Sequence, residues 1–162
     1  MTRAVVQQLE SLLNRSFDGQ NTQSLLANLN QVQTEDWEWL PHGGERSIRA
    51  IFQHAAIAKH IYADFLFSED TRTWAQVEAE CHARGGADTA ALVDWAREGH
   101  ARFMAGIASL RDADLPEMTT KWHGARDTKA EVIAVMIQHD CYHAGEINHL
   151  RAVHQQRDGL WG

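Results

Sequence analysis

The sequence predicts an all-α protein, a four-helix bundle with long crossover connections. Long segments carry apolar residues spaced three and four apart, as one face of a helix requires, and no segment shows the alternation typical of a strand. The two prolines, Pro41 and Pro116, fall in apparent loops and leave the long helices unbroken. A length of 162 residues fits one domain, expected to span residues 1–162.

The first helix is expected from Arg3 to Arg15, where apolar residues recur on one face. A second, shorter helix follows at about Thr22 to Gln33, after the interruption FDGQN. The stretch DWEWLPHGGER is a loop, because Pro41 and the pair Gly43-Gly44 break regular structure. A long helix then extends from about Ser47, a suitable N-cap, to Phe67.

A connection of about 20 residues with some helix in it leads to Asp88 or Thr89, which caps a helix ending near Leu110. The next stretch, RDADLPEMTTKWHGARD, is expected to be a long loop. The TKAE segment, Thr128 to Glu131, has the form of a capping box and opens the last helix, which continues to about Gln155. Links this long allow successive helices to lie apart in the bundle.

Composition argues against several classes of partner. The formal charge is −7 and there is no run of Lys and Arg, so a nucleic-acid-binding surface is not expected. No apolar stretch approaches the length of about 20 residues that a membrane span needs, and the amphipathic N-terminus lacks the apolar core of a signal peptide. The two cysteines, Cys81 and Cys141, form no CxxC pair. These features favour a cytoplasmic protein.

Two histidines and a glutamate interrupt the apolar face of the last helix. Since an α-helix turns about 100° per residue, His143 lies about 40° to one side of His139 and Glu146 about 20° to the other. In the helix that starts at Ser47, His54 also falls in the apolar stripe. The last helix's stripe otherwise holds Val132, Val135, Met136, Leu150 and Val153, and its opposite side is expected to carry Asp140, Lys129 and Gln155.

A metal ion would explain polar groups on these two faces. A buried polar group without a partner costs about 1–3 kcal/mol, and imidazoles at i and i+4 can converge on one ion. The sequence therefore predicts a divalent metal site on His54, His139 and His143. Zinc, nickel and iron all suit imidazole ligands, so the metal's identity stays open. The alternative is a set of core histidines bonded to the backbone or to each other.

Glu146 is the candidate catalytic residue. It can bond a ligand histidine's second nitrogen, accept a substrate proton or ligate the metal; the structural alternative is an ion pair with Arg151 or another helix. Cys141 is expected to be a small packed residue, because it lies about 200° around the helix from His139. The other histidines are expected on exposed faces or loops: His42, His60, His82, His100, His149 and His154.

The segment HDCYHAGEINHLRA resembles the closing helix of the DinB/YfiT-like superfamily, with the pattern H-x-x-x-H-x-G-x-I-x-x-L-R. The run LANLNQVQTEDWEWLPHGGERSIRAIFQHAAIAKHIY is similar to that family's approach to its first histidine ligand, matched here by His54. The resemblance covers about Phe17 to Val153. Trp122 and His123 resemble a loop feature near the family's pocket, so the resemblance makes them candidates to line it. Departures are Glu146, where Gln is common, and Ala144, where Arg is common. The pattern is met by His139, His143, Gly145, Ile147, Leu150 and Arg151.

The resemblance implies a four-helix bundle with two crossovers, often dimeric, that holds a divalent metal on three histidines. Some members transfer low-molecular-weight thiols such as bacillithiol, mycothiol or glutathione to electrophiles, one branch isomerises maleylpyruvate, and many have no known activity. The family name reflects induction by DNA damage. We therefore expect a homodimeric metal-dependent enzyme, such as a thiol transferase or a hydrolase, acting on a small molecule. A non-catalytic metal-binding stress-response protein and a helical interaction module are the alternatives.

Overall fold

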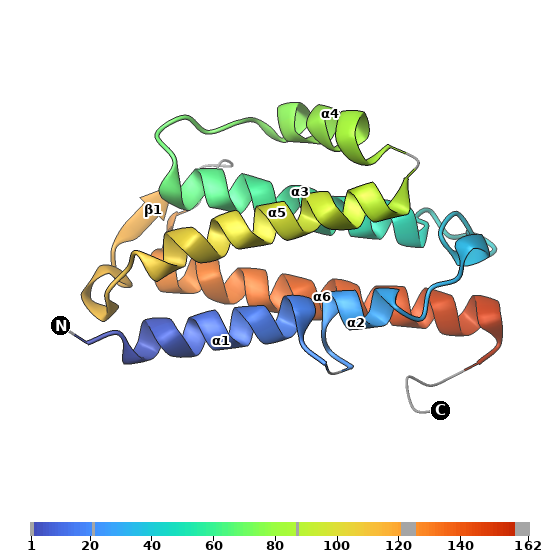
Figure 1. Cartoon of the computed structure of the whole chain (residues 1–162), viewed down its shortest axis with the longest axis horizontal. Helices are drawn as coiled ribbons and strands as arrows, with labels where there is room; N and C mark the ends of the chain where they lie inside the picture. The colour runs from blue at the N-terminus through green and yellow to red at the C-terminus, as the bar shows by residue number, and fades with distance from the viewer. Residues whose placement is uncertain (1, 21, 87, 121–125, 158–162) are drawn as a thin grey trace.

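The computed structural model describes residues 2–20, 22–86, 88–120 and 126–157. Four long helices form a bundle in these residues (Figure 1): α1 (Ala4–Asp18), α3 (Ile48–Phe67), α5 (Thr89–Ala108) and α6 (Lys129–Gln155). Shorter elements complete the described chain: α2 (Leu25–Leu29), α4 (Trp74–Gly85), the 3-10 turns η1 (Thr34–Asp36) and η2 (Asp112–Asp114), and strands β1 (Met118–Thr120) and β2 (Arg126–Thr128). The predicted all-α class is confirmed.

Of the successive long helices, α3 and α5 lie side by side, whereas α1 and α3, and α5 and α6, lie diagonally across the bundle. α3 packs against α5 and α6, and α1 packs against the same two helices, so α1 lies diagonally across from α3 and α5 across from α6. In Figure 1, α1 and α6 run in one direction along the bundle, and α3 and α5 run in the other. The link between α3 and α5 carries the chain back along the outside and contains α4, which packs on both helices. The link between α3 and α5 is therefore a crossover, as predicted, because the two helices that it joins run in the same direction.

Side-chain caps start the helices where the sequence predicts. The Ser47 hydroxyl accepts a hydrogen bond from the Ala50 amide at the start of α3. At α6, the Thr128 hydroxyl accepts from the Glu131 amide, and the Glu131 carboxylate accepts from the Thr128 amide at 2.7 Å. Asp88 caps α5 by accepting from the amides of the second and third helical residues. These bonds confirm the predicted boundaries of the helices that carry the histidines.

Two predictions about local structure are wrong. The second helix is only five residues long, Leu25–Leu29, and the chain reaches η1 without extending it to Gln33. The segment before α6 is not all loop, because β1 and β2 form an antiparallel pair in which Met118 lies opposite Thr128. Strands of three residues are too short to show the alternating pattern by which sequence analysis detects a strand.

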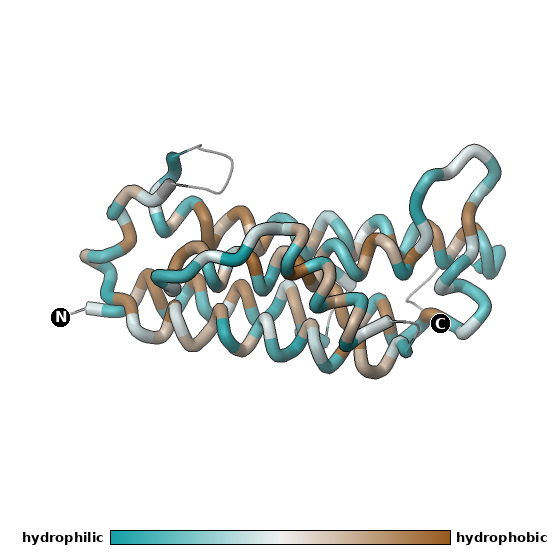
Figure 2. Tube along the Cα trace, turned by 90° about the horizontal axis from the view of Figure 1, so that it is seen from above, coloured by the Kyte–Doolittle hydropathy of each residue, from teal (hydrophilic) through white to brown (hydrophobic). Residues whose placement is uncertain are grey.

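Hydrophobic side chains fill the interior of the bundle along its length. The tube in Figure 2 shows hydrophobic and hydrophilic residues interleaved along the helices, as amphipathic helices require. The α3–α5 contact is especially close, since a Cβ atom added at Gly99 would lie 2.6 Å from Cδ2 of His60. None of the described helices is both long and apolar enough to cross a lipid bilayer.

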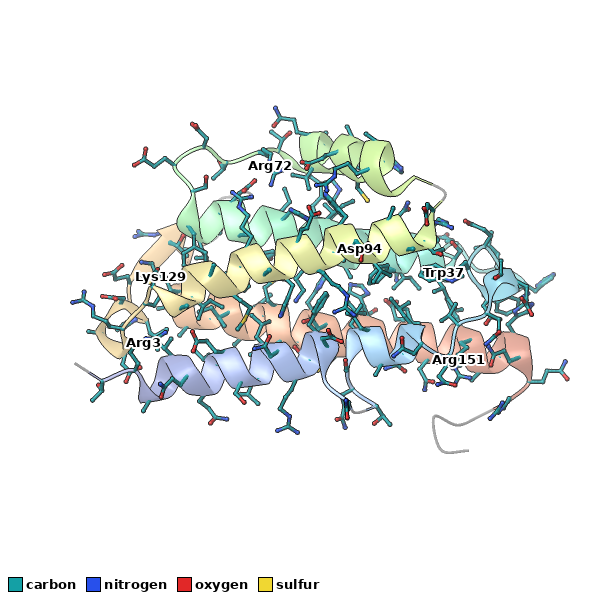
Figure 3. The ribbon with its side chains drawn as sticks, in the orientation of Figure 1. Arg3, Trp37, Arg72, Asp94, Lys129 and Arg151 are labelled. Carbon is teal, nitrogen blue, oxygen red and sulfur yellow. The ribbon has the colours of Figure 1, made fainter. Side chains whose placement is uncertain are left out.

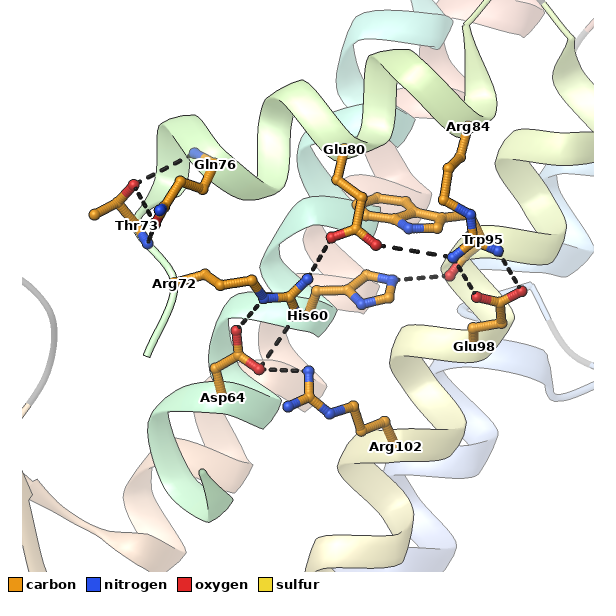
Figure 4. Close-up of polar contacts among 10 residues, drawn as sticks. All are labelled: His60, Asp64, Arg72, Thr73, Gln76, Glu80, Arg84, Trp95, Glu98 and Arg102. Atoms are coloured by element: carbon orange, nitrogen blue, oxygen red, sulfur yellow. Dashed lines mark hydrogen bonds and ion pairs between the residues drawn. The ribbon is translucent and has the colours of Figure 1, made fainter. Parts of the chain in front are cut away.

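Ion pairs fasten α4 to the bundle (Figure 4). Arg72, just before α4, donates to the buried carboxylate of Asp64 on α3 at 2.6 Å, and Arg102 of α5 pairs with the same carboxylate. Burial would raise the pKa of Asp64, but the two guanidinium groups outweigh it and lower the pKa. Arg84 of α4 reaches Glu98 of α5 at 2.7 Å. These contacts hold α4 over the α3 face that carries His54.

Candidate metal centre

The three predicted histidines converge between α3 and α6. His139 and His143 lie one turn apart on α6, with their Nε2 atoms 3.1 Å apart, and Nε2 of His54 on α3 is 3.2 Å from that of His139. One nitrogen from each ring lies within 4.8 Å of the others. Two nitrogen ligands of a tetrahedral zinc ion lie about 3.3 Å apart. The group can therefore hold a divalent metal ion.

Burial keeps the imidazoles neutral. His143 is 3% exposed, and His54 and His139 are partly buried. Burial, followed by the nearby His143 and His54, lowers the pKa of His139 to about 3. Burial also lowers the pKa of His54 and of His143. Because only an unprotonated imidazole nitrogen can bind a metal, the site is ready to accept an ion at neutral pH.

Hydrogen bonds among the three rings alone leave some of their nitrogen atoms without a partner. Each Nε2–Nε2 contact can carry only one proton, so neutral rings cannot all donate to one another. Nδ1 of His139 is buried and has no hydrogen-bond partner among the described residues. A cation at the convergence of the three Nε2 atoms would use their lone pairs together. The donor set thus fits a metal better than it fits the alternative of core histidines bonded to each other.

Glu146 lies against the site from the side of His143. Its Oε2 is 2.6 Å from Nδ1 of His143, and its Oε1 accepts from Nη2 of Arg46 at 2.6 Å. This carboxylate raises the pKa of His143 but does not overcome the effect of burial. The ion pair with Arg151, which was the structural alternative for Glu146, is not formed. Arg151, on the part of α6 that packs beside α2 (Figure 3), instead bonds Asn148 and Gln155.

The buried face of α6 is rotated from the predicted stripe. Its buried residues are Val132, Ile133, Met136, Asp140, His143, Ala144, Ile147 and Arg151. The middle of this set lies about 80° around the helix from His139. Val153, placed in the stripe by sequence, is 47% exposed. The reason is that α6 packs against α1 and α2 as well as α3, so its buried face is broader than one stripe.

Asp140 is consequently a correction to the sequence analysis. It was expected on the polar side of α6, but it is fully buried and pairs with the equally buried Lys59 of α3, Oδ2 to Nζ at 2.6 Å. The hydroxyl of Ser16 on α1 donates to the same oxygen at 3.0 Å. This pair joins α3 and α6 beside the histidines. Sequence reasoning missed it because an Asp and a Lys in helices normally indicate exposed positions.

Trp74, the first residue of α4, packs over His54 at the edge of the site. Its ring centroid lies 5.1 Å from that of His54. It lines a cavity of about 240 Å³ together with His54, Gln53, Ala50, Ile57, Glu78 and His82. It also borders a larger cavity of about 510 Å³, whose walls include Ile61 and Phe65. A small molecule therefore has room beside His54.

The predictions of exposure for the other histidines and the cysteines are partly confirmed and partly wrong. His42, His82 and His149 are exposed as expected, whereas His60 and His100 are buried and His154 is partly buried. His60 contacts the Trp95 carbonyl, His100 contacts Asn14, and His154 contacts Asp36. Cys141 is exposed, not packed, and Cys81 is buried in α4, where burial raises the pKa of its thiol to about 11. Trp122 and His123 lie outside the described residues.

A family model describes most of the chain. The model of the DinB superfamily matches residues 18–147, which include all three histidines and Glu146. The chain belongs to the DinB superfamily. No curated protein shows a significant match to it. The predicted family is thereby confirmed, and the three-histidine group that could hold a metal ion is seen in the structure of this chain itself.

Proposed function

We propose that this DinB-superfamily protein binds one divalent metal ion through His54, His139 and His143, and uses it as an enzyme that activates a low-molecular-weight thiol or water. The convergence of the three Nε2 atoms carries the proposal, since Nε2 of His139 lies 3.1 Å from that of His143 and 3.2 Å from that of His54. Three imidazole ligands leave one to three coordination positions open, as in catalytic rather than structural sites. The cavity of about 240 Å³ beside His54 can hold a small substrate.

The contacts of the histidines and of Glu146 assign each residue a role. When bound, a divalent ion lowers the pKa of a coordinated thiol or water, to about 7 for water on zinc. The three imidazoles would hold the ion through their Nε2 atoms. Glu146 accepts a hydrogen bond from Nδ1 of His143 and so orients that ligand. Because both oxygens of Glu146 are engaged, its contacts favour this positioning role over proton transfer from a substrate.

The metal assignment is tested by elemental analysis. Purified protein is expected to contain about one divalent ion per chain, and His54→Ala, His139→Ala and His143→Ala are each expected to lose it after mild chelation. His149→Ala, at an exposed position of the same helix, serves as the control and is expected to retain the metal. Wild-type metal content in each of the three variants would refute the assignment.

The catalytic assignment is tested separately. Metal-loaded protein is assayed for conjugation of bacillithiol, mycothiol and glutathione to a chromogenic electrophile, with the His143→Ala variant as the blank. Metal-dependent turnover with one thiol supports a transferase. Metal binding without turnover of thiol or ester substrates would support the non-catalytic metal-binding protein. Absence of metal binding would leave a helical interaction module.

A further inference from the structure

Arg46 is a charged residue beside the histidines that sequence analysis did not single out. It immediately precedes Ser47, whose side chain caps α3, so its backbone is anchored at the start of that helix. Its side chain is 48% exposed, and Nη2 donates to Oε1 of Glu146 at 2.6 Å. The contact joins the residue before the N-cap of α3 to α6, and α3 and α6 are the helices that carry the three histidines.

Glu146 is held at both oxygens. Oε1 accepts from Arg46, and Oε2 lies 2.6 Å from Nδ1 of His143, which is 3% exposed. A carboxylate held at both oxygens has one orientation, whereas an exposed glutamate held at one oxygen samples several rotamers. A continuous chain of contacts therefore runs from the surface at Arg46 to the buried His143, whose Nε2 faces His139.

We propose that Arg46 is a positioning residue of the metal site, which locks Glu146 onto Nδ1 of His143 and thereby keeps the Nε2 lone pair of His143 directed at the metal. An imidazole that donates from Nδ1 has its unprotonated nitrogen at Nε2, the atom that faces the other two ligands. The inference rests on the proposed function insofar as the three histidines bind a metal. The proposal adds Arg46, which lies outside the helices, to the residues that shape the metal site.

The positive charge of Arg46, taken alone, would weaken metal binding. The guanidinium lies close enough to lower the pKa values of His54 and His143, although burial is the larger cause for both. A cation that disfavours protons on these rings also disfavours a metal cation there. If Arg46 acted only through its charge, its removal would tighten metal binding. A positioning role predicts weaker binding, so the sign of the effect separates the two.

The test compares zinc affinities measured by competition with a chelator of known affinity. Arg46→Met is expected to weaken zinc binding about two- to fivefold, as for loss of an exposed ion pair, and Glu146→Ala about 10–100-fold. Arg97→Met is the matched control, because Arg97 is also 48% exposed and pairs with Asp18, and the cavity that it lines contains none of the three histidines. In the Glu146→Ala background, Arg46→Met is expected to have no further effect. Unchanged or tighter binding in Arg46→Met, or the same loss in both backgrounds, would overturn the proposal.

A measurement without metal separates this inference from the proposed function. In chelated protein, ¹⁵N NMR of the His143 ring is expected to show the Nδ1–H tautomer in the wild type, and a mixture with Nε2–H in Arg46→Met. Arg97→Met is expected to match the wild type. If the wild type binds no zinc, the metal proposal fails, and the tautomer still decides the role of Arg46. An identical tautomer in the wild type and Arg46→Met would refute that role.

Discussion

The pair between Lys59 and Asp140 gives the largest expected effect on stability. Both side chains are fully buried, and Nζ lies 2.6 Å from Oδ2. Removing one partner leaves the other buried without a counter-charge, which typically costs 3–5 kcal/mol. For a chain of this size, a loss of 1 kcal/mol lowers the melting temperature by about 2–4 °C. Lys59→Met and Asp140→Asn are therefore each expected to lower it by about 6–20 °C at pH 7.

The two variants are expected to respond to pH in opposite directions. Burial raises the pKa of Asp140, and Lys59→Met removes the cation that opposes this rise, so the pKa of Asp140 in the folded variant is expected to rise further. A raised pKa gives stability at low pH that is lost as pH rises above about 4, where the unfolded carboxyl ionises. Burial lowers the pKa of Lys59, and Asp140→Asn removes its partner. That variant is expected to gain stability as pH rises toward about 10.

Urea unfolding of chelated protein between pH 5 and 9 measures both effects without a metal contribution. The double variant Lys59→Met/Asp140→Leu removes both charges and is expected to be near wild type or more stable, because the Ser16 hydroxyl that donates to Asp140 can donate to the Leu13 carbonyl instead. Arg97→Met breaks an exposed pair and is expected to cost at most about 1 kcal/mol. Losses below about 1 kcal/mol in both single variants, or parallel pH profiles, would refute the reasoning.

Three further predictions concern the site and the bundle. His139 has a pKa of about 3 in the folded protein and about 6.5 in the unfolded chain, so chelated protein is expected to lose stability as pH falls from about 6.5 toward 3. Urea midpoints that stay constant over this range would contradict this expectation. Glu146→Gln is expected to keep the helical circular dichroism spectrum while its zinc affinity falls, at most about 100-fold; loss of the fold would count against a positioning role. Gly99→Ala is expected to lower the free energy of unfolding in urea by about 1–3 kcal/mol, because its Cβ would lie 2.6 Å from Cδ2 of His60. Gly145→Ala, whose Cβ would have nothing within 4 Å, is expected to raise it by about 0.4–1 kcal/mol. Equal effects of the two substitutions would show that the α3–α5 contact adjusts to the added methyl group.

Local chemistry explains which parts of the fold were predictable. The caps at Ser47, Asp88 and Thr128 depend on residues three or fewer positions away, so the sequence indicates them directly. The short hairpin depends on pairing between separate segments, with Met118 opposite Thr128, and three residues carry no usable period. The single-turn helix Leu25–Leu29 likewise ends before its apolar pattern does.

The histidines and their neighbours show the same division. The spacing of His139 and His143 and the register of His54 are properties of single helices, so the sequence by itself determined the three candidate ligands. Only the tertiary structure decided that Asp140 is buried against Lys59 and that Glu146 is held by Arg46 rather than Arg151. Those contacts join residues 81 and 100 positions apart. They depend on how α6 is rotated against its neighbours, and the periodicity of one helix carries no information about which neighbours widen its buried face.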